Sequence, residues 1–366
     1  MKRALLIANF NSFHRQFNLP YIKRLSEKGY QVSLVSAGGN EFDDIEEKYN
    51  IAFDRTPYKL KNIKSFFKLR SVFSTYYDVI YISTSVIGAF GRLALLGKKH
   101  GRVIYSAHGY NFYKVNGKIV GKIYLPIEKF LSKICDCIFT MNQEDYETTI
   151  EYNFPCKEIY NVDGVGIDTK RFGKPTVEEK NTLRKQHGYS EDTFILFYAA
   201  ELTERKNQRI LFDVLQELIK KHKNVKLLLA GAGTETESYK TIVAEKGLNE
   251  YIEFLGFRCD VSTLLKLSDV LFASSLNEGL PINMIEGLAT GLPVVATAVR
   301  GHVDLIENGR NGYLFDIDSP VMASDSICKL IEDKLLYDRF SEQALVSSQM
   351  YDINVVIHQY DKIFGI

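Results

Sequence analysis

Residues 277–297 read NEGLPINMIEGLATGLPVVAT and contain the signals of a loop, a helix and a strand in close succession. Pro281 suits the first helical position, where a missing N–H costs nothing. Gly291 is a typical residue for ending a helix, so the sequence predicts a helix over 281–290. The apolar run at 292–297 then predicts a strand. A helix followed at once by a buried strand is typical of a parallel α/β sheet.

The same alternation of strand and helix patterns covers the rest of the chain. Helical patterns lie at 17–28, 119–133, 208–221, 264–267 and throughout 319–366, and 173–188 is polar enough to predict a connector. Runs rich in Val and Ile predict strands at 4–8, 31–36, 79–83, 103–107 and 137–141, and again at 194–202, 225–233, 251–257, 270–275 and 293–297.

This pattern predicts an α/β fold of two doubly wound, Rossmann-like parallel-sheet domains that face each other across a cleft. A chain of 366 residues is also too long for one ordinary core. We expect an N-terminal domain over 1–166 and a C-terminal domain over 167–345. We expect the helix at 346–366 to pack back on the N-terminal domain.

The composition is that of an ordinary globular protein, with 45% hydrophobic and 25% charged residues. The apolar run that starts the chain breaks at Asn9 and no small-residue cleavage site follows, so it predicts a buried strand and not a signal peptide. Five cysteines without a CxxC pair or histidines at metal spacing indicate a reducing cytoplasm and no structural zinc. Residues 1–166 hold 23 basic and 16 acidic side chains, although the net charge of the whole chain is only +1.

The first chemical signal is a pair of glutamates around the predicted helix start. The free N–H groups and positive dipole end of that helix would suit a phosphate-bearing ligand. Glu278 precedes the helix. Glu286 lies five residues after the helix start, which is roughly 7.5 Å along the helix axis at 1.5 Å per residue. Carboxylates accept hydrogen bonds from vicinal hydroxyls, so the pair fits a nucleotide sugar. An acidic helix start with one solvated glutamate is the alternative.

A second signal lies in AAELTERKNQRILFDVL, residues 199–215, where a strand ends and a helix begins. The loop between them carries Arg205 and Lys206 side by side. Two cations at this position suit a pyrophosphate group and would stabilise the negative charge that grows on it if it is a leaving group. An exposed basic turn without function is the alternative.

The segment EGLPINMIE resembles the E-x7-E element of the family 4 retaining glycosyltransferases, which have the two-domain GT-B fold. The resemblance implies that Glu286 binds the nucleotide ribose and that Glu278 hydrogen-bonds the donor hexose. It implies catalytic roles for His108, Arg205, Lys206 and Glu278. Donor-binding roles follow for Gly279, Leu280, Pro281 and Ile282, whose backbone amides would serve the donor, together with Glu286.

Two glycines and a histidine match the family more loosely. LAGAGTE at 229–235 resembles its donor-side loop, so we expect Gly231 and Gly233 to line the donor pocket. His108 follows a strand in VIYSAHGYNFYK and matches a family histidine near the reacting centre, although an isolated histidine is more often structural. The chain departs from many members at Ala200 and Glu201, where they have Gly-Arg.

The first loop also departs from the family. Many members have a Gly-Gly pair after the first strand, and this chain has NFNSFHRQF at 9–17 instead. We expect His14 and Arg15 to offer side chains to an anionic acceptor in place of the backbone contact.

KLKNIKSFFKLRSVF, residues 59–73, has lysines on one helical stripe and apolar residues on another. Such a helix can rest on an anionic membrane surface, or its aromatic face can belong to the core. The basic charge of the same domain favours contact with the inner leaflet. Nucleic-acid binding could also use such charge, but no recognised module accompanies it.

The resulting hypothesis is a metal-independent hexosyltransferase without a cofactor, in the cytoplasm or peripheral on the inner face of its membrane. HGYNFYK, YLPIEKFLSKICDCIFTMNQEDYE and VDGVGID resemble the branch that builds capsular or exopolysaccharide units. That resemblance implies a UDP-linked donor and a polyprenyl-pyrophosphate-linked saccharide acceptor. The alternatives are a UDP-sugar 2-epimerase of the same fold and a non-catalytic sugar- or lipid-binding subunit. A dehydrogenase is weaker, because the glycine turns lack G-x-G-x-x-G spacing.

Overall fold

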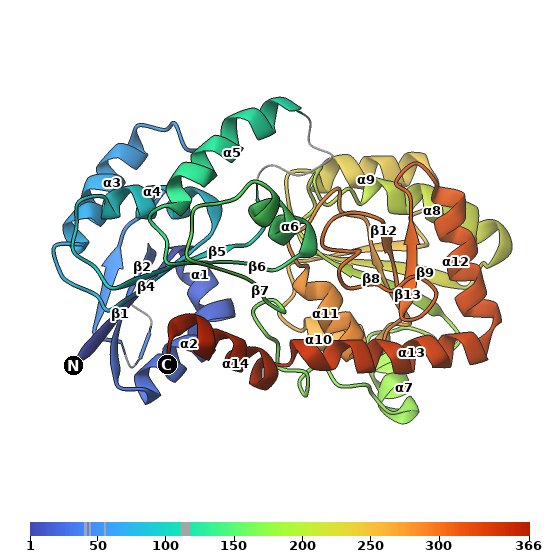
Figure 1. Ribbon diagram of the computed structural model, residues 1–366. Coiled ribbons are helices and arrows are strands. Elements are labelled where there is room, and N and C mark those ends of the chain that lie inside the picture. The colour runs from blue at the N-terminus through green and yellow to red at the C-terminus, as the bar shows by residue number, and fades with distance from the viewer. Residues whose placement is uncertain (40–41, 44, 55, 111–117) are drawn as a thin grey trace. The chain divides into compact units, whose positions relative to one another are not determined.

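The computed structural model describes residues 1–39, 42–43, 45–54, 56–110 and 118–366, and the contacts of this part of the chain divide it into two units (Figure 1). Unit 1 contains Met1–Gly166 together with Ile353–Ile366, and unit 2 contains Ile167–Asp352. The expected boundary at 346 falls inside a helix of unit 2 that ends at Ser348.

Unit 1 is built on a seven-stranded, fully parallel sheet of order β3-β2-β1-β4-β5-β6-β7. Its strands are β1 (Lys2–Phe10), β2 (Tyr30–Ala37), β3 (Glu47–Asn50), β4 (Val79–Ser83), β5 (Arg102–Ala107), β6 (Cys137–Thr140) and β7 (Glu158–Asn161). Its helices are α1 (Asn11–Phe13), a π-helix (His14–Asn18), α2 (Leu19–Glu27), α3 (Lys61–Val72), α4 (Ser85–Leu95), α5 (Lys118–Ser132), α6 (Gln143–Glu151) and α14 (Ile353–Phe364).

Unit 2 repeats the design with a six-stranded parallel sheet of order β10-β9-β8-β11-β12-β13. Its strands are β8 (Phe194–Ala199), β9 (Val225–Ala230), β10 (Ile252–Gly256), β11 (Val270–Ala273), β12 (Val294–Thr297) and β13 (Gly312–Phe315). Its helices are α7 (Val177–Gln186), α8 (Arg209–Lys221), α9 (Thr236–Glu245), α10 (Val261–Leu267), α11 (Ile282–Ala289), α12 (Pro320–Glu332), α13 (Lys334–Ser348) and the 3-10 turn Gln349–Tyr351.

The prediction of two doubly wound parallel-sheet domains is confirmed. In each sheet the strand order reverses once, between β1 and β4 in unit 1 and between β8 and β11 in unit 2. Helices that leave the two strands at such a switch point cover opposite faces of the sheet. The carboxyl ends of these strands therefore border a crevice, which is where open α/β sheets bind ligands.

Several expected elements differ from the structure. The connector at 173–188 contains α7, whose capping box joins the Thr176 hydroxyl to the Glu179 amide and the Glu179 carboxylate to the Thr176 amide. Pro281 is the N-cap of α11, with extended backbone, and the helix begins one residue later. The short strands β3, β7 and β13 were not predicted. β3 and β7 carry polar residues, and β13 has only three apolar residues after a glycine.

The last helix, α14, completes unit 1. The ring of Tyr360 stacks on Tyr21 with centroids 4.0 Å apart, and its hydroxyl donates to the Gly164 carbonyl at 3.1 Å. Asp361 pairs with Arg24, Nη2 to Oδ2, at 2.6 Å. Gly166 has φ +73°, and a Cβ there would lie 2.9 Å from Ile353 Cα, so the turn before unit 2 requires glycine.

Candidate functional site

The candidate site is formed by the two loops that follow β8 and β11, the switch-point strands of unit 2. The first loop carries Arg205 and Lys206, and the second carries Glu278. Backbone bonds join the loops, because the Leu276 amide donates to the Arg205 carbonyl at 2.8 Å. The Ser274 hydroxyl donates to the Lys206 carbonyl at 2.9 Å. Residues 68 and 71 positions apart in the sequence are thus held at one edge of the sheet.

Glu278 lies at the centre of this site and is 9% exposed. Its Oε1 accepts from the Lys206 ammonium at 2.5 Å and from the Ser275 hydroxyl at 2.6 Å. Its Oε2 accepts from Arg205 Nη1 at 3.0 Å. The structure therefore brings together three of the four residues with predicted catalytic roles, and it joins them as one charge cluster.

Electrostatics keep the Glu278 carboxylate ionised. Burial alone would raise its pKa, but attraction to Lys206 and Arg205 and hydrogen bonds from Lys206 and Ser275 outweigh burial and lower the pKa to about 2. An ionised carboxylate can only accept hydrogen bonds, so Glu278 suits a ligand that donates hydroxyl protons.

The two cations keep capacity for a further anion. An ammonium has three donors and a guanidinium has five, and Glu278 takes one from each side chain. The Arg205 side chain is 48% exposed and the Lys206 side chain is 14% exposed. Arg205 also donates from Nη1 to the Asn277 carbonyl at 3.1 Å, which fixes the guanidinium beside the loop.

Helix α11 starts directly after this cluster. Gly279, Leu280 and Pro281 form its approach, and Ile282 is its first residue. The Met284 amide donates to the Pro281 carbonyl at 3.1 Å. The N–H groups of Ile282 and Asn283 have no carbonyl partner within the helix, so they are available to an anion. The Asn283 side chain donates to the Ala199 carbonyl at 2.9 Å, which ties the helix start to the end of β8.

Glu286 differs from Glu278 in its surroundings. It is half-buried on α11, and no described group forms a hydrogen bond with its carboxyl group. Burial raises its pKa to about 7, with a smaller opposing effect from Arg171. Glu286 therefore changes charge near neutral pH, and a ligand that donates hydrogen bonds would favour the ionised form.

Gly231 and Gly233 have a structural reason to be glycine. A Cβ at Gly231 would lie 1.9 Å from the Ala200 carbonyl oxygen, and one at Gly233 would lie 2.2 Å from the Leu202 carbonyl oxygen. Both residues let the loop after β9 approach the loop that carries Arg205 and Lys206. This close approach shapes the site, whether or not either glycine touches a ligand.

The fourth residue with a predicted catalytic role, His108, lies in unit 1, after β5. Its Nε2 is buried, as are Asn9 Oδ1 and Thr84 Oγ1, and none of the three atoms has a hydrogen-bond partner among the described residues. These residues lie at the carboxyl ends of the adjacent strands β5, β1 and β4. Burial lowers the pKa of His108 to about 4, so its ring is neutral at pH 7. Residues 111–114 of the HGYNFYK motif lie outside the described residues.

His14 has a packing role in the structure. It is fully buried, its Nε2 donates to the Val35 carbonyl at 3.1 Å, and its Nδ1 accepts from the Asn18 amide at 2.9 Å. With both nitrogens used, the ring has no group left for an acceptor, so the prediction for His14 lacks structural support. Arg15 is exposed, near the ring of Phe42. It borders a cavity of about 630 Å³ that also includes Lys23.

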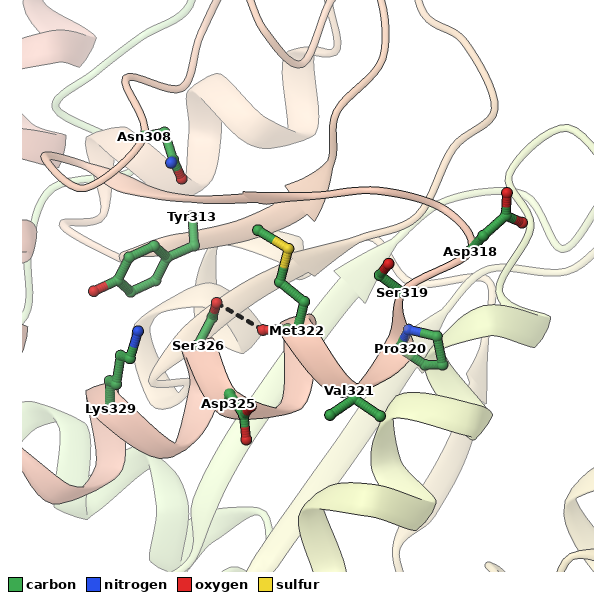
Figure 2. Close-up of a pocket in the computed structure, with 10 residues that line it drawn as sticks. All are labelled: Asn308, Tyr313, Asp318, Ser319, Pro320, Val321, Met322, Asp325, Ser326 and Lys329. Carbon is green, nitrogen blue, oxygen red and sulfur yellow. Dashed lines mark hydrogen bonds between the residues drawn. The ribbon is translucent and has the colours of Figure 1, made fainter.

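Another cavity, of about 650 Å³, lies at the start of α12 (Figure 2). Tyr313 of β13 and Lys329 of α12 lie on one side of it, with the ammonium 5.6 Å from the ring centroid. Pro320, Val321 and Met322 form its apolar part (Figure 2). None of the predicted site residues lines this cavity.

One group of described residues has the composition of a metal site. Ligand atoms of His222, Cys328 and Glu332 lie within 4.8 Å of one another where α8 meets α12. His222 Nε2 and Glu332 Oε1 already lie 3.0 Å apart, within hydrogen-bond distance. Burial raises the pKa of the Cys328 thiol, with a smaller opposing effect from Lys221, so the thiol keeps the proton that a metal ligand must lose. We therefore interpret this group as a surface hydrogen bond beside a buried thiol.

Ser275 and Tyr198 also belong to the site, although no sequence motif indicated them. Ser275 bonds Glu278 directly, and the Tyr198 hydroxyl lies 2.8 Å from the Ser275 hydroxyl. The sequence does contain one signal for Ser275, the pair Ser274-Ser275 at the end of an apolar strand. Polar residues at the carboxyl end of a switch-point strand border the ligand-binding crevice.

Comparison with known proteins identifies the class. The model of the glycosyl transferases group 1 matches residues 179–346, and that of glycosyl transferase 4-like proteins matches 3–142. The chain is 35% identical over 366 residues to EpsD of Bacillus subtilis (strain 168), which is named as a glycosyltransferase, and the match covers 96% of each chain. It therefore belongs to the family 4 glycosyltransferases of the GT-B fold.

Two further comparisons are with one more relative and with one solved structure. The UDP-Gal:alpha-D-GlcNAc-diphosphoundecaprenol alpha-1,3-galactosyltransferase of Escherichia coli is 23% identical, with 88% of this chain and 85% of that protein covered. The crystal structure of Anabaena HepE in complex with UDP and glucose has a TM-score of 0.80 at 19% identity, with both chains fully covered. This second likeness concerns the fold alone.

Proposed function

We propose that this glycosyltransferase moves a hexose from a UDP-linked donor to a polyprenyl-pyrophosphate-linked saccharide, with retention of the anomeric configuration. The observation that carries the proposal is the cluster of Arg205, Lys206 and Glu278 at the switch point of unit 2. The two cations can bind a diphosphate, and the neighbouring carboxylate can accept hydrogen bonds from the hydroxyl groups of a sugar. The name of the Escherichia coli relative, which contains both UDP-Gal and diphosphoundecaprenol, supports this substrate class.

In this proposal unit 2 binds the donor. The diphosphate contacts Arg205, Lys206 and the first turn of α11, and Glu286 accepts hydrogen bonds from the ribose. Glu278 accepts hydrogen bonds from the transferred hexose. The cations stabilise the charge that develops on the leaving diphosphate, which is the main electrostatic demand of the reaction.

Retention follows from attack on the same face as the leaving group. Glu278 is held by three donors and has a pKa of about 2, so it is a poor candidate for a covalent nucleophile. The acceptor hydroxyl would attack the anomeric carbon as the bond to the diphosphate breaks, and the departing phosphate oxygen would take its proton. His108 of unit 1 lies on the proposed acceptor side, and its neutral ring can accept or donate one hydrogen bond.

A lipid-linked acceptor requires an approach to a membrane surface, and unit 1 has suitable helices. On α3, Ile63 and Phe67 are 53% and 63% exposed. On α5, an exposed apolar stripe runs along one face, at Ile123, Ile127 and Phe130. Exposed lysines accompany both helices: Lys61, Lys64, Lys68, Lys122 and Lys129. Apolar stripes flanked by lysines suit an anionic leaflet. No helix in the described part of the chain combines the length and apolar character that a membrane span needs.

The first experiment is a thermal-shift screen of UDP, GDP, ADP and their sugars, because a ligand of the native state raises Tm by mass action. We expect UDP and at least one UDP-sugar to stabilise the protein. Transfer to a synthetic polyprenyl-pyrophosphate saccharide then tests the reaction, and an unchanged rate in EDTA tests metal independence. Turnover of the donor without any acceptor would favour the 2-epimerase. No shift with any nucleotide would contradict the proposal.

The membrane contact is tested separately with vesicles. Sedimentation with vesicles containing phosphatidylglycerol should be weakened by Ile127→Ser/Phe130→Ser, while UDP binding stays unchanged. A matched control is Val346→Ser on α13 of unit 2, where the side chain is 54% exposed. Equal sedimentation of the three proteins would contradict membrane contact through α5.

A further inference from the structure

Two consecutive serines after β11 hold different parts of the candidate site. Both side chains are fully buried. The Ser274 hydroxyl donates to the Lys206 carbonyl, in the backbone of the loop that carries Arg205 and Lys206, called here the cation loop. The Ser275 hydroxyl donates to the Glu278 carboxylate instead. The first serine therefore fixes a loop, and the second fixes a functional side chain.

Ser275 belongs to a directed chain of hydrogen bonds. The Glu278 carboxylate only accepts, so the single hydroxyl proton of Ser275 is used in the 2.6 Å bond to Oε1. The Tyr198 hydroxyl, 2.8 Å from Ser275 Oγ, must then donate to it. Tyr198 is 1% exposed, and burial raises its pKa, so it keeps this proton. The chain runs from Tyr198 through Ser275 to Glu278.

The backbone of Ser275 is also fixed. The Thr297 hydroxyl donates to the Ser275 carbonyl at 2.7 Å. His302 Nδ1 lies 2.9 Å from the Thr297 carbonyl and donates to it. Burial lowers the pKa of His302 to about 4, so the ring is neutral and keeps one proton for this bond. Ser275 is thus held on both sides by neutral, buried groups.

The neutral character of this support matters when a diphosphate binds. Arg205 and Lys206 would then share their donors between Glu278 and the phosphates. The Ser275 hydroxyl is neutral and already donates to Glu278, so we expect this bond to persist when the cations turn toward the phosphates. Without it, the carboxylate would follow the cations toward the phosphates.

We infer that Ser275, oriented by Tyr198, is a positioning residue that fixes Glu278 for the transferred sugar and so sets the preference for a nucleotide sugar over the bare nucleoside diphosphate. This inference rests on the proposed function of the site. It assigns sugar recognition to a hydrogen-bond chain that reaches the core of unit 2, beyond the residues that touch the donor.

The test compares binding of UDP with binding of UDP-glucose, UDP-galactose and UDP-N-acetylglucosamine by calorimetry. Ser275→Ala should weaken binding of the preferred UDP-sugar about tenfold, as expected for a lost hydrogen bond to a charged group. Binding of UDP alone should stay unchanged, which also shows that the variant is folded. Ser275→Thr keeps the hydroxyl and should restore the preference, and Tyr198→Phe should lose part of it.

Ser274→Ala is the matched comparison, because it loosens the cation loop and should weaken UDP and UDP-sugar equally. A double-mutant cycle adds a second readout: in a Glu278→Ala background, Ser275→Ala should have no further effect on UDP-sugar binding. Equal losses for UDP and UDP-sugar in Ser275→Ala, or an unchanged ratio, would overturn the inference while leaving the proposed function intact. Failure of the wild-type protein to bind any uridine compound would overturn both.

Discussion

The two sheets end in loops of opposite character. In unit 2 the loops after the switch-point strands carry full charges that satisfy one another, with Glu278 held between Arg205 and Lys206. In unit 1 the equivalent ends carry neutral polar atoms, on Asn9, Thr84 and His108, that have no partner among the described residues. One fold thus supports two kinds of site. The charged site suits an anionic ligand, and the neutral one suits hydroxyl groups.

The largest effect is expected from removing the two cations of unit 2. Arg205→Ala/Lys206→Ala should lower the rate of sugar transfer by about a hundredfold or more, as expected when about 3 kcal/mol of transition-state stabilisation is lost. Binding of UDP should weaken in the same variant. Lys220→Ala, which removes an exposed lysine paired with Glu217, is the control and should change neither quantity. Full activity in the double variant would end the assignment of the diphosphate site.

A change in unit 1 should separate the two sites. His108→Ala should lower the transfer rate about tenfold, because it would remove the one hydrogen bond that His108 is proposed to make to the acceptor. Its UDP affinity should equal that of the wild type, since the nucleotide is proposed to bind unit 2. The pKa of about 4 also predicts no step in rate from this residue between pH 6 and 8. A large loss of UDP affinity in His108→Ala would show that the two sites are not separate.

Glu286 allows a finer comparison, because it is a carboxyl group of unit 2 without the cations that hold Glu278. Its pKa is about 7, so the ionised form, which is proposed to accept hydrogen bonds from the ribose hydroxyls, is lost as pH falls below 7. We expect UDP affinity to be constant above pH 8. Below pH 7 it should decrease by a factor that approaches about ten for each pH unit. Glu286→Gln should remove most of this pH dependence and weaken binding about tenfold at pH 8.

The control for that measurement is Glu237→Gln on α9, where the carboxylate is exposed. It should keep the pH dependence of the wild type. A pH profile that is the same for Glu286→Gln and the wild type would assign the titrating group to another residue.

Much of the fold could be predicted from the sequence. Buried parallel strands are continuous apolar runs, and the prediction for 79–83 matches β4 residue for residue. Edge strands such as β7 are partly exposed and polar, so their residues lacked this signal. The helix α7 was missed because it is polar, although its capping-box residues Thr176 and Glu179 are visible in the sequence.

The candidate site was predictable as a set of residues but not as an arrangement. The motif indicated Glu278 and the loop indicated Arg205 and Lys206, each from local spacing. Their mutual ion pairs depend on the neighbouring positions of β8 and β11, which no local pattern specifies. His14 shows the opposite case, in which a local pattern indicates a site residue that the structure places in the core. A histidine after a first strand resembles a ligand-binding residue, but the π-helix turns it into the core.

The position of α14 has a consequence for how the chain is made. Unit 1 begins with Met1 but receives its last helix only at Ile353–Phe364, after all of unit 2. On a ribosome, unit 2 therefore has its full set of strands and helices before unit 1 does. The first-made sheet must wait with the face around Tyr21 uncovered until Tyr360 emerges and stacks on it. Unit 1 can therefore complete its contacts only after the segment Ile353–Ile366 has been made.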